Sequence, residues 1–195
     1  MSFRQIGKCT RGARRHESAL SPERFKLEPS ARRFFSNEIA RHLLPFLTPL
    51  AGRIVSLYWP IRAEPDLRSL ASAIRAGGAA CALPVVVEKQ APMVFRLWEP
   101  GMNLVPGIWN IPAPPDGSPV TPDVVVAPVV GYDRACFRLG YGGGYFDRTL
   151  VRLRNRPLAV GVGYAQSELP TIYPFPHDIP LDGVVTERGV LKSVH

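Results

Sequence analysis

Four glycines interrupt one short stretch of the chain, Leu139-Gly140-Tyr141-Gly142-Gly143-Gly144-Tyr145-Phe146-Asp147. Glycine adopts positive φ angles and lets a ligand approach backbone N–H groups closely. A helix is predicted next, because Phe146, Leu150 and Leu153 recur at spacings of four and three. Unpaired N–H groups and the helix dipole favour an anion at such a helix start. The sequence therefore predicts a phosphate site, with Asp147 placed to hold the metal ion of a nucleotide.

The spacing of these glycines excludes the two commonest phosphate loops. The chain has no G-x-x-x-x-G-K-[ST] motif, and the register does not fit the dinucleotide motif G-x-G-x-x-G. A glycine-rich turn alone is often only a tight connection. The longer string from Arg138 to Asp147, however, resembles the R-L-G-x-G-x-G-[YF]-[YF]-D signature of the 5-formyltetrahydrofolate cyclo-ligase (methenyltetrahydrofolate synthetase) family. We expect Gly143, the middle of three consecutive glycines, to adopt positive φ.

Composition favours one globular domain over residues 1–195, with 46% hydrophobic and 21% charged residues. No apolar run is long enough to cross a bilayer, and the N-terminus lacks the apolar region of a secretory signal. The three cysteines are an odd number without a C-x-x-C pair, which indicates reduced thiols rather than disulfides or a zinc site. We expect a cytoplasmic monomer without membrane contact.

Most of the net charge of +8 lies near the N-terminus, where residues 1–33 hold nine basic and three acidic side chains. This excess indicates a solvated basic face, a nonspecific nucleic-acid contact, or attraction of a polyanionic small molecule. The chain has no RNA-binding motif, so no specific nucleic acid is expected. Residues 1–29 are predicted to be basic and irregular, with one helix start at Ser21-Pro22-Glu23.

Helical and strand patterns alternate along the chain. Phe35, Ile39, Leu43 and Leu47 predict a helix over 31–47, and a second helix is predicted over 67–74. Strands or strand-like apolar runs are expected at 54–58, 80–87, 93–97, 124–130, 158–164 and 181–186. The Pro- and Gly-rich stretch 98–123 is expected to be a long functional loop. The alternation predicts an α/β fold whose mainly parallel sheet is covered by helices on both faces.

A second candidate site follows the strand at 54–58, in the segment Tyr58-Trp59-Pro60-Ile61-Arg62-Ala63-Glu64-Pro65-Asp66. Ligands bind beyond the carboxyl ends of parallel strands, so this segment and the glycine loop should share one edge. An aromatic pair can stack on a planar ring, and a carboxylate can bind its N–H groups. The alternative to a ligand site is a structural role, in which the Trp fills space in the core and the Glu lies on the surface. The segment is similar to the family's Y-x-P-x-x-x-E-[VIP]-D region, which implies that Glu64 anchors the pterin and Trp59 lines its pocket.

Three further segments carry the resemblance. Gly107–Pro114 is similar to G-x-[WFY]-[GN]-I-P-x-P, which implies that Trp109 contacts the folate, although a Trp there also suits a structural staple. His177–Glu187 is similar to the family's H-D-x-x-[LV]-D-x-[VI]-[VL]-T-[ED], which implies that Asp178 holds Mg²⁺ together with Asp147. Near the N-terminus, Lys8 and Arg11 best match the family's phosphate-binding Lys and Arg, with Arg14 and Arg15 as competitors.

Together these segments imply a ligase that uses ATP and Mg²⁺ to convert 5-formyltetrahydrofolate to 5,10-methenyltetrahydrofolate. Arg138, Tyr141 and Tyr145 would be the catalytic side chains, and the two tyrosines would flank the formyl group. Residues 138–146 would bind ATP: Arg138, Leu139, Gly140, Tyr141, Gly142, Gly143, Gly144, Tyr145 and Phe146. The segment 141–145 would also touch the folate. The alternative from another class is a non-catalytic nucleotide- or RNA-binding module on the same fold.

Overall fold

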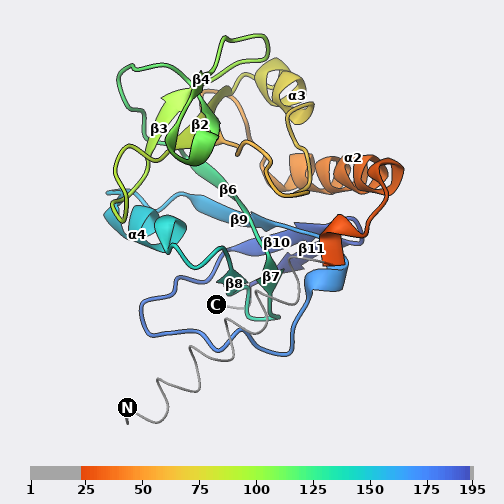
Figure 1. Ribbon diagram of the computed structural model, residues 1–195. Coiled ribbons are helices and arrows are strands. Elements are labelled where there is room, and N and C mark those ends of the chain that lie inside the picture. The colour runs from red at the N-terminus through yellow and green to blue at the C-terminus, as the bar shows by residue number, and fades with distance from the viewer. Residues whose placement is uncertain (1–22, 194–195) are drawn as a thin grey trace.

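The computed structural model describes residues 23–193, and its centre is a seven-stranded sheet (Figure 1). The strand order is β11-β10-β9-β6-β1-β2-β3. The five inner strands run parallel, and β3 and β11 pair antiparallel at the two edges. The strands are β1 Ile54–Ser56, β2 Ala80–Val85, β3 Val94–Leu97, β6 Val124–Pro128, β9 Leu158–Val162, β10 Gly183–Thr186 and β11 Gly189–Lys192. The predicted mainly parallel α/β sheet is confirmed.

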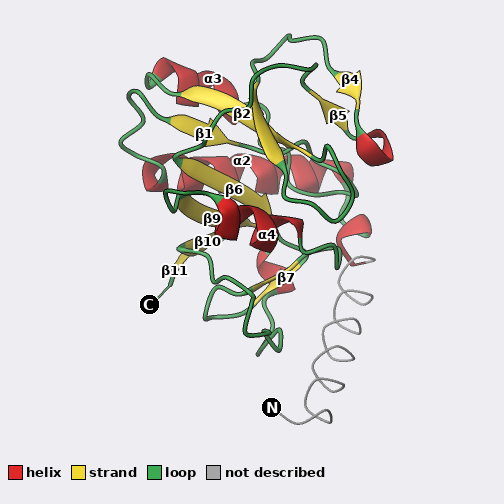
Figure 2. Ribbon diagram, turned by 90° about the vertical axis from the view of Figure 1, so that its left-hand side faces the viewer, coloured by secondary structure: helices red, strands yellow, loops and turns green. Residues whose placement is uncertain are grey.

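Both faces of the sheet are buried. Successive side chains on a strand point to opposite faces, so neighbouring residues of β6 show what covers each face. On β6, Val124 and Val126 belong to one core cluster, which also takes side chains from α2 (Pro29–Phe46) and α3 (Leu70–Ala76). Val125 belongs to a second cluster together with Leu150 of α4 (Tyr145–Arg152). Figure 2 shows α4 in front of the sheet and α2 behind it. Helices therefore cover both faces, as the apolar strands predict.

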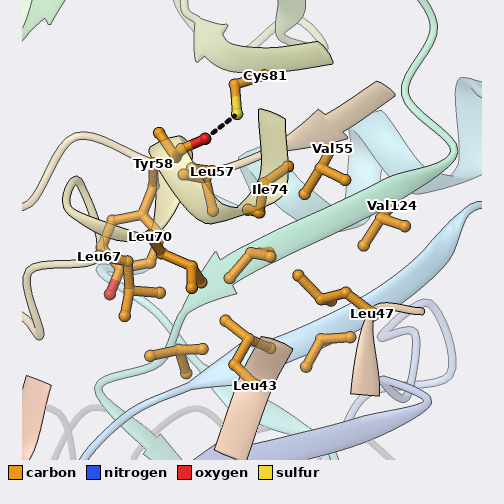
Figure 3. Packing of buried hydrophobic residues seen from close by; sticks show 14 of the residues in the cluster. Leu43, Leu47, Val55, Leu57, Tyr58, Leu67, Leu70, Ile74, Cys81 and Val124 are labelled. Atoms are coloured by element: carbon orange, nitrogen blue, oxygen red, sulfur yellow. Dashed lines mark hydrogen bonds between the residues drawn. The ribbon is translucent and has the colours of Figure 1, made fainter. Parts of the chain in front are cut away.

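Helix α2 supplies one side of the larger cluster through side chains four residues apart. Ile39, Leu43 and Leu47 have no exposed surface and belong to the same core cluster as Val55 and Val124; Figure 3 shows Leu43 and Leu47 in this cluster. The helix begins at Pro29, two residues earlier than predicted, because proline suits the first helical turn, where its missing N–H costs no hydrogen bond. Residues 67–69, predicted as helical, lie instead before α3.

The described part of the N-terminal segment agrees with the helix start predicted at Ser21-Pro22-Glu23. Residues 23–25 are helical, and Arg24 in this turn is only 3% exposed. The candidate phosphate contacts Lys8 and Arg11, and their competitors Arg14 and Arg15, lie outside the described residues. Within the described part, no helix is long and apolar enough to span a membrane.

The two long connections near the site carry small β-ribbons. The stretch 98–123 contains β4 (Val105–Pro106), a 3₁₀ turn η1 (Ile108–Asn110) and β5 (Pro112–Ala113), so it is more ordered than predicted. The strand predicted over 124–130 ends at Pro128, and the chain then forms the hairpin of β7 (Gly131–Tyr132) and β8 (Arg138–Leu139). A second 3₁₀ turn, η2 (Ala165–Ser167), follows β9. The hairpin delivers the glycine loop to the start of α4.

Two cysteines fall within the described residues, and both are free and buried. Burial raises the pKa of the Cys81 thiol and of the Cys136 thiol to about 11. Both thiols are therefore protonated at neutral pH and act as small core side chains.

Candidate active site

The candidate site lies beyond the carboxyl ends of β1 and β6, where two loops meet. The loop after β1 carries Glu64, and the glycine loop reached from β6 carries Tyr141. The Tyr141 hydroxyl donates a hydrogen bond of 3.0 Å to Oε1 of Glu64. This bond joins residues 77 positions apart. It confirms that the two predicted motifs occupy one edge of the sheet.

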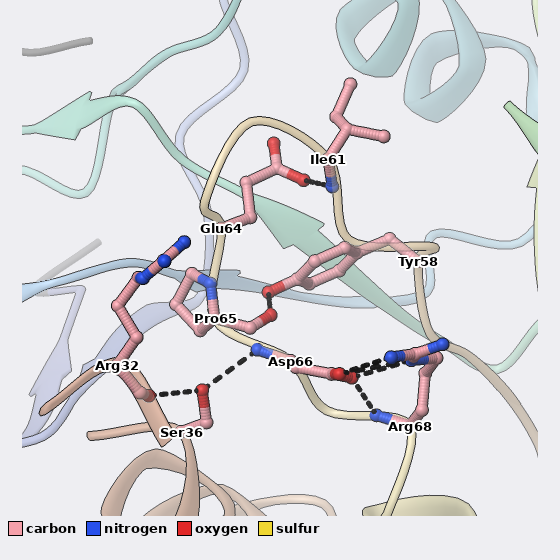
Figure 4. A network of polar contacts seen from close by, with 8 residues as sticks. All are labelled: Arg32, Ser36, Tyr58, Ile61, Glu64, Pro65, Asp66 and Arg68. Carbon is pink, nitrogen blue, oxygen red and sulfur yellow. Dashed lines mark hydrogen bonds and ion pairs between the residues drawn. The ribbon is translucent and has the colours of Figure 1, made fainter. Parts of the chain in front are cut away.

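Glu64 is a buried carboxylate, with 6% of its surface exposed. The Ile61 N–H donates to its Oε2 at 2.9 Å, so each carboxylate oxygen accepts a hydrogen bond (Figure 4). Burial raises the pKa of Glu64 to about 7, and the Ile61 N–H, the Arg24 guanidinium and the Tyr141 hydroxyl oppose that rise. The surface-Glu alternative is thus excluded, because this carboxylate is buried and its burial raises its pKa.

Local hydrogen bonds fix the loop that presents Glu64. The Tyr58 hydroxyl donates to the carbonyl of Pro65 at 2.6 Å, and the Asp66 N–H donates to the Ser36 hydroxyl at 2.9 Å (Figure 4). Arg62 and Ala63 adopt positive φ angles of 48° and 60°, which are uncommon for residues with a Cβ. The buried Tyr58 and the α2 hydroxyl therefore hold a strained turn in place.

A cleft of about 750 Å³ opens beside Glu64. Trp59 and Trp98 form part of its wall, with ring centroids 6.4 Å apart and the rings nearly perpendicular. Trp59 lines the cleft and also packs against the core cluster that holds Tyr58, so it serves both as cleft wall and as part of the core packing. Four cations also line the cleft, and its two acidic side chains are Glu64 and Asp66. These cations are Arg32, Arg33, Arg62 and Arg68.

The glycine loop ends at Gly144, which has a left-handed conformation and lies immediately before α4. Gly142 and Gly144 have φ angles of 74° and 59°, whereas Gly143 lies outside the left-handed region. The expectation of positive φ at Gly143 is therefore wrong. Gly143 is constrained instead by the ring of Tyr145, because a Cβ at this position would lie 2.7 Å from two ring carbons. A Cβ at Gly140 would meet nothing within 4 Å.

Arg138 and Asp147 form an ion pair at the start of α4. The Arg138 side chain is only 5% exposed, and its Nη2 lies 2.7 Å from Oδ1 of Asp147. Its Nη1 donates to the Ile179 carbonyl at 2.9 Å, and the Ile179 N–H donates to Oδ1 of Asp147 at 3.2 Å. Burial lowers the pKa of Arg138, and Asp147 opposes that effect. The pair thus ties the glycine loop to the C-terminal segment.

Asp178 lies near this ion pair, because it directly precedes Ile179, whose N–H is bonded to Asp147. Its Oδ2 accepts a hydrogen bond of 2.6 Å from the Phe175 N–H. One oxygen of each carboxylate, Oδ2 of Asp147 and Oδ1 of Asp178, accepts no hydrogen bond from the described residues. No group of three or more His, Cys, Asp or Glu side chains within residues 23–193 is arranged to hold a metal ion. Two carboxylates remain sufficient for Mg²⁺, which keeps several waters and uses substrate phosphates as ligands.

Trp109 and Tyr145 form a separate aromatic pair beside the glycine loop. Their ring centroids are 5.4 Å apart in an edge-on arrangement, and the Tyr145 hydroxyl accepts a hydrogen bond of 3.0 Å from the Gln90 N–H. Trp109 is 57% exposed, so it is not a staple holding the loop to the core. The predicted folate contacts thus fall into two groups: Trp59 and Glu64 at the cleft, and Trp109 and Tyr145 at the glycine loop. Tyr141 connects the two groups, because it belongs to the glycine loop and its hydroxyl is hydrogen-bonded to Glu64.

Sequence reasoning missed Arg24. Its guanidinium donates to the Tyr141 hydroxyl and lies 5.3 Å from the centroid of the Tyr141 ring. In the sequence Arg24 is one of nine basic residues before position 34, and only its place beside the predicted helix start at Ser21-Pro22-Glu23 distinguishes it.

The fold and the site define an α/β protein in which a glycine-rich loop and a buried carboxylate meet at one sheet edge. The family model described as the 5-formyltetrahydrofolate cyclo-ligase family matches residues 10–187. The chain therefore belongs to that family.

Individual relatives agree with this assignment over most of the chain. It is 30% identical to a 5-formyltetrahydrofolate cyclo-ligase of Mycolicibacterium smegmatis, over 73% of this chain and 78% of that protein. It is 29% identical to the cyclo-ligase of Escherichia coli, over 88% and 98% of the two chains. The solved structure of Aquifex aeolicus 5,10-methenyltetrahydrofolate synthetase superposes with a TM-score of 0.80 at 28% identity, covering 94% of this chain and 93% of that one.

Proposed function

We propose that this protein is a 5-formyltetrahydrofolate cyclo-ligase, which closes 5-formyltetrahydrofolate to 5,10-methenyltetrahydrofolate at the expense of ATP. The formyl oxygen is a poor leaving group, so it first accepts the γ-phosphoryl group of ATP, and ADP leaves. N10 of the folate then attacks the activated formyl carbon and releases its proton to solvent, the C–O bond breaks, and phosphate departs as the ring closes. This chemistry requires positioning and charge neutralisation, and it needs no covalent nucleophile from the protein.

The hydrogen bond between Tyr141 and Glu64 is the observation that carries this proposal. A reaction between ATP and folate requires a phosphate loop and a folate anchor in direct reach of each other. Tyr141 belongs to the first and contacts the second. A module that bound only a nucleotide would have no need for a buried carboxylate hydrogen-bonded to its glycine loop.

The cleft beside Glu64 suits the folate. Glu64 would pair with the amino and ring N–H groups of the pterin, and Trp59 would line the same pocket. Trp109 and Tyr145 would approach the folate from the side of the glycine loop. Folates carry carboxylates beyond the pterin, and the cationic lining of the cleft matches that charge.

The glycine loop suits the phosphates of ATP. Backbone N–H groups between Leu139 and Phe146, including Gly140, Gly142, Gly143 and Gly144, would surround them, and Arg138 would neutralise charge. Lys8 and Arg11 would add cations from the N-terminal segment. Asp147 and Asp178 would hold Mg²⁺, which when bound offsets the charge of the phosphates. The proposal places this enzyme in the cytoplasm as a monomer.

Absorbance of the methenyl product tests the proposal directly. The full chain, mixed with Mg-ATP and 5-formyltetrahydrofolate, should give an absorbance rise that requires ATP and is matched by released phosphate. Omission of ATP, or its replacement by a nonhydrolysable analogue, should abolish the rise. The rival, a non-catalytic nucleotide- or RNA-binding module, predicts no rise and RNA binding that weakens steeply with salt.

The variant Asp147→Asn tests the metal assignment. We expect turnover to fall and the Mg²⁺ concentration for half-maximal rate to rise, because a neutral amide is a weaker ligand for a hard cation. Asp147 also pairs with the buried Arg138, so the melting temperature should fall as well. Mg²⁺ titrations of activity at saturating ATP measure the first effect, and thermal melting without ligand measures the second.

Asp178→Asn serves as the matched variant, because its carboxylate forms no ion pair with Arg138. It should raise the Mg²⁺ requirement with a smaller loss of turnover. If Asp147→Asn melts lower but keeps the wild-type Mg²⁺ requirement, Asp147 only anchors Arg138 and the metal assignment is wrong.

A further inference from the structure

Arg24 is a buried cation that contacts the link between the glycine loop and the carboxylate. Its side chain comes from the helical turn 23–25, which precedes α2, and 3% of the residue is exposed. The guanidinium donates to the hydroxyl of Tyr141, which in turn donates to Oε1 of Glu64. It forms no ion pair with a carboxylate of the described residues. Arg24 therefore reaches Glu64 through one intervening hydroxyl group.

We propose that Arg24 is a positioning residue for the folate anchor, which holds the Tyr141 hydroxyl toward Glu64 and keeps the Glu64 carboxylate ionised. The inference rests on the proposed function, because it treats Glu64 as the group that binds the pterin. A carboxylate that accepts N–H bonds from a ligand must be ionised when the ligand binds. A buried cation one hydroxyl away favours that state.

The other groups around Glu64 cannot replace Arg24. The loop after β1 contributes the Ile61 N–H and Arg62, which is exposed and lies over the Tyr141 ring without a hydrogen bond to Glu64. Tyr58 and Tyr164 also face Glu64, but burial raises their pKa, so both are neutral at pH 7. The nearby negative charge of Asp66 is paired with Arg68. Arg32 of α2 lines the same cleft, but it is only half-buried and forms no hydrogen bond to Glu64. Arg24 is thus the fully buried cation whose charge acts on Glu64 among the described groups.

Arg24 should affect the binding of the two substrates unequally. Tyr141 belongs to the glycine loop, so a change in its hydroxyl position affects both the loop and the folate anchor. Among the described residues, however, the hydrogen bond and the ring contact of the Arg24 guanidinium are both made with Tyr141. Loss of Arg24 should therefore weaken folate binding much more than ATP binding. This difference separates a positioning role toward Glu64 from a direct phosphate contact.

The experiment compares Arg24→Met, Arg24→Lys and the control Lys26→Met. Lys26 lies in the same segment, but it is exposed and pairs with Glu23 on the surface. The dissociation constant for 5-formyltetrahydrofolate is measured between about pH 5 and 9, alongside the dissociation constant for Mg-ATP, KM, kcat and the melting temperature. Lys26→Met tests the loss of one positive charge from this segment away from the site.

For Arg24→Met we expect folate affinity to fall about tenfold at pH 7, the usual effect of losing a hydrogen bond to a charged group. Folate binding is lost as pH falls and Glu64 takes up a proton. Without Arg24 the Glu64 pKa rises, so the pH midpoint of that loss should move upward. KM for folate should rise more than kcat falls. Arg24→Lys should restore the pH midpoint, and Lys26→Met should leave all these quantities unchanged.

Two results would overturn the inference. An unchanged pH midpoint in Arg24→Met would make Arg24 purely structural, and a larger loss of ATP affinity than of folate affinity would make it a phosphate contact. If Arg24→Met does not fold, Arg24→Gln and Tyr141→Phe decide: their effects on folate affinity should not add in the double variant, because both act through one hydroxyl. Additive effects would contradict the inference. A wild-type protein without folate turnover would instead refute the proposed function.

Discussion

Gly143→Val should reduce ATP-dependent turnover by about a hundredfold or more, the scale expected when reacting groups are displaced by about 1 Å. A Cβ at Gly143 would lie 2.7 Å from two carbons of the Tyr145 ring. That ring cannot move freely, because its hydroxyl accepts a hydrogen bond from the Gln90 N–H and the ring packs edge to face with Trp109. The valine therefore displaces Tyr145, the first residue of α4, and with it the loop that presents N–H groups to phosphate.

Thermal melting with and without Mg-ATP separates a damaged ligand site from a damaged fold. Overpacking of this kind costs about 1–3 kcal/mol, so a lower melting temperature is expected without ligand. Bound ligand normally raises the melting temperature according to its affinity, and this increase should disappear in Gly143→Val. Gly140→Ala is the control for folding, since its Cβ meets no protein atom within 4 Å and should leave the unliganded melting temperature unchanged. A Gly143→Val protein stabilised normally by Mg-ATP would contradict the phosphate role.

Glu64→Gln should weaken folate binding by about 1.5–3 kcal/mol, the usual effect of losing a hydrogen bond to a charged group. Glutamine retains the shape of the side chain, but its amide cannot accept two N–H bonds from the pterin. ATP binding should change much less, because Glu64 contacts the glycine loop only through Tyr141. Equilibrium binding of each ligand measures both effects. Unchanged folate affinity would remove Glu64 from the site.

The same variant should also change how stability depends on pH. Burial raises the pKa of Glu64 from 4.5 to about 7, so between these values the folded chain binds more protons than the unfolded chain. The wild-type protein therefore loses stability as pH rises through that window, by about 3 kcal/mol in total. Glutamine does not titrate, so the stability of Glu64→Gln relative to wild type should increase by a similar amount from pH 4.5 to 8. Denaturant unfolding measures the difference, with the exposed Glu88→Gln as control.

The sequence was most informative where one property of a segment determined its structure. Continuous apolar runs such as 124–130 predicted buried parallel strands, since both faces of those strands pack against helices. The sheet-edge rule for parallel strands then placed Glu64 and Tyr141 together, and their hydrogen bond confirms it. These predictions needed no knowledge of side-chain packing.

Predictions that depended on where side chains lie in the folded protein were less successful. Gly143 was expected to need positive φ, but its constraint is the ring of Tyr145, which only the three-dimensional structure brings against it. Arg24 was one basic residue among nine, and its partner Tyr141 lies 117 residues further along the chain. The edge strand β11 also went unpredicted, because only alternate residues of it are half-buried.

The bonds from Arg138 to Asp147 and to the Ile179 carbonyl determine when the glycine loop can become fully anchored during synthesis of the chain. The glycine loop emerges from the ribosome well before residue 179, so at that stage the Arg138 guanidinium lacks one of its two partners. Strand β10, which pairs beside β9, is made later still. A nascent chain that ends before this segment cannot complete the loop's anchorage. The anchorage of the glycine loop is thus completed only after residue 179 has been made, and truncation before Ile179 should loosen a loop more than 30 residues upstream.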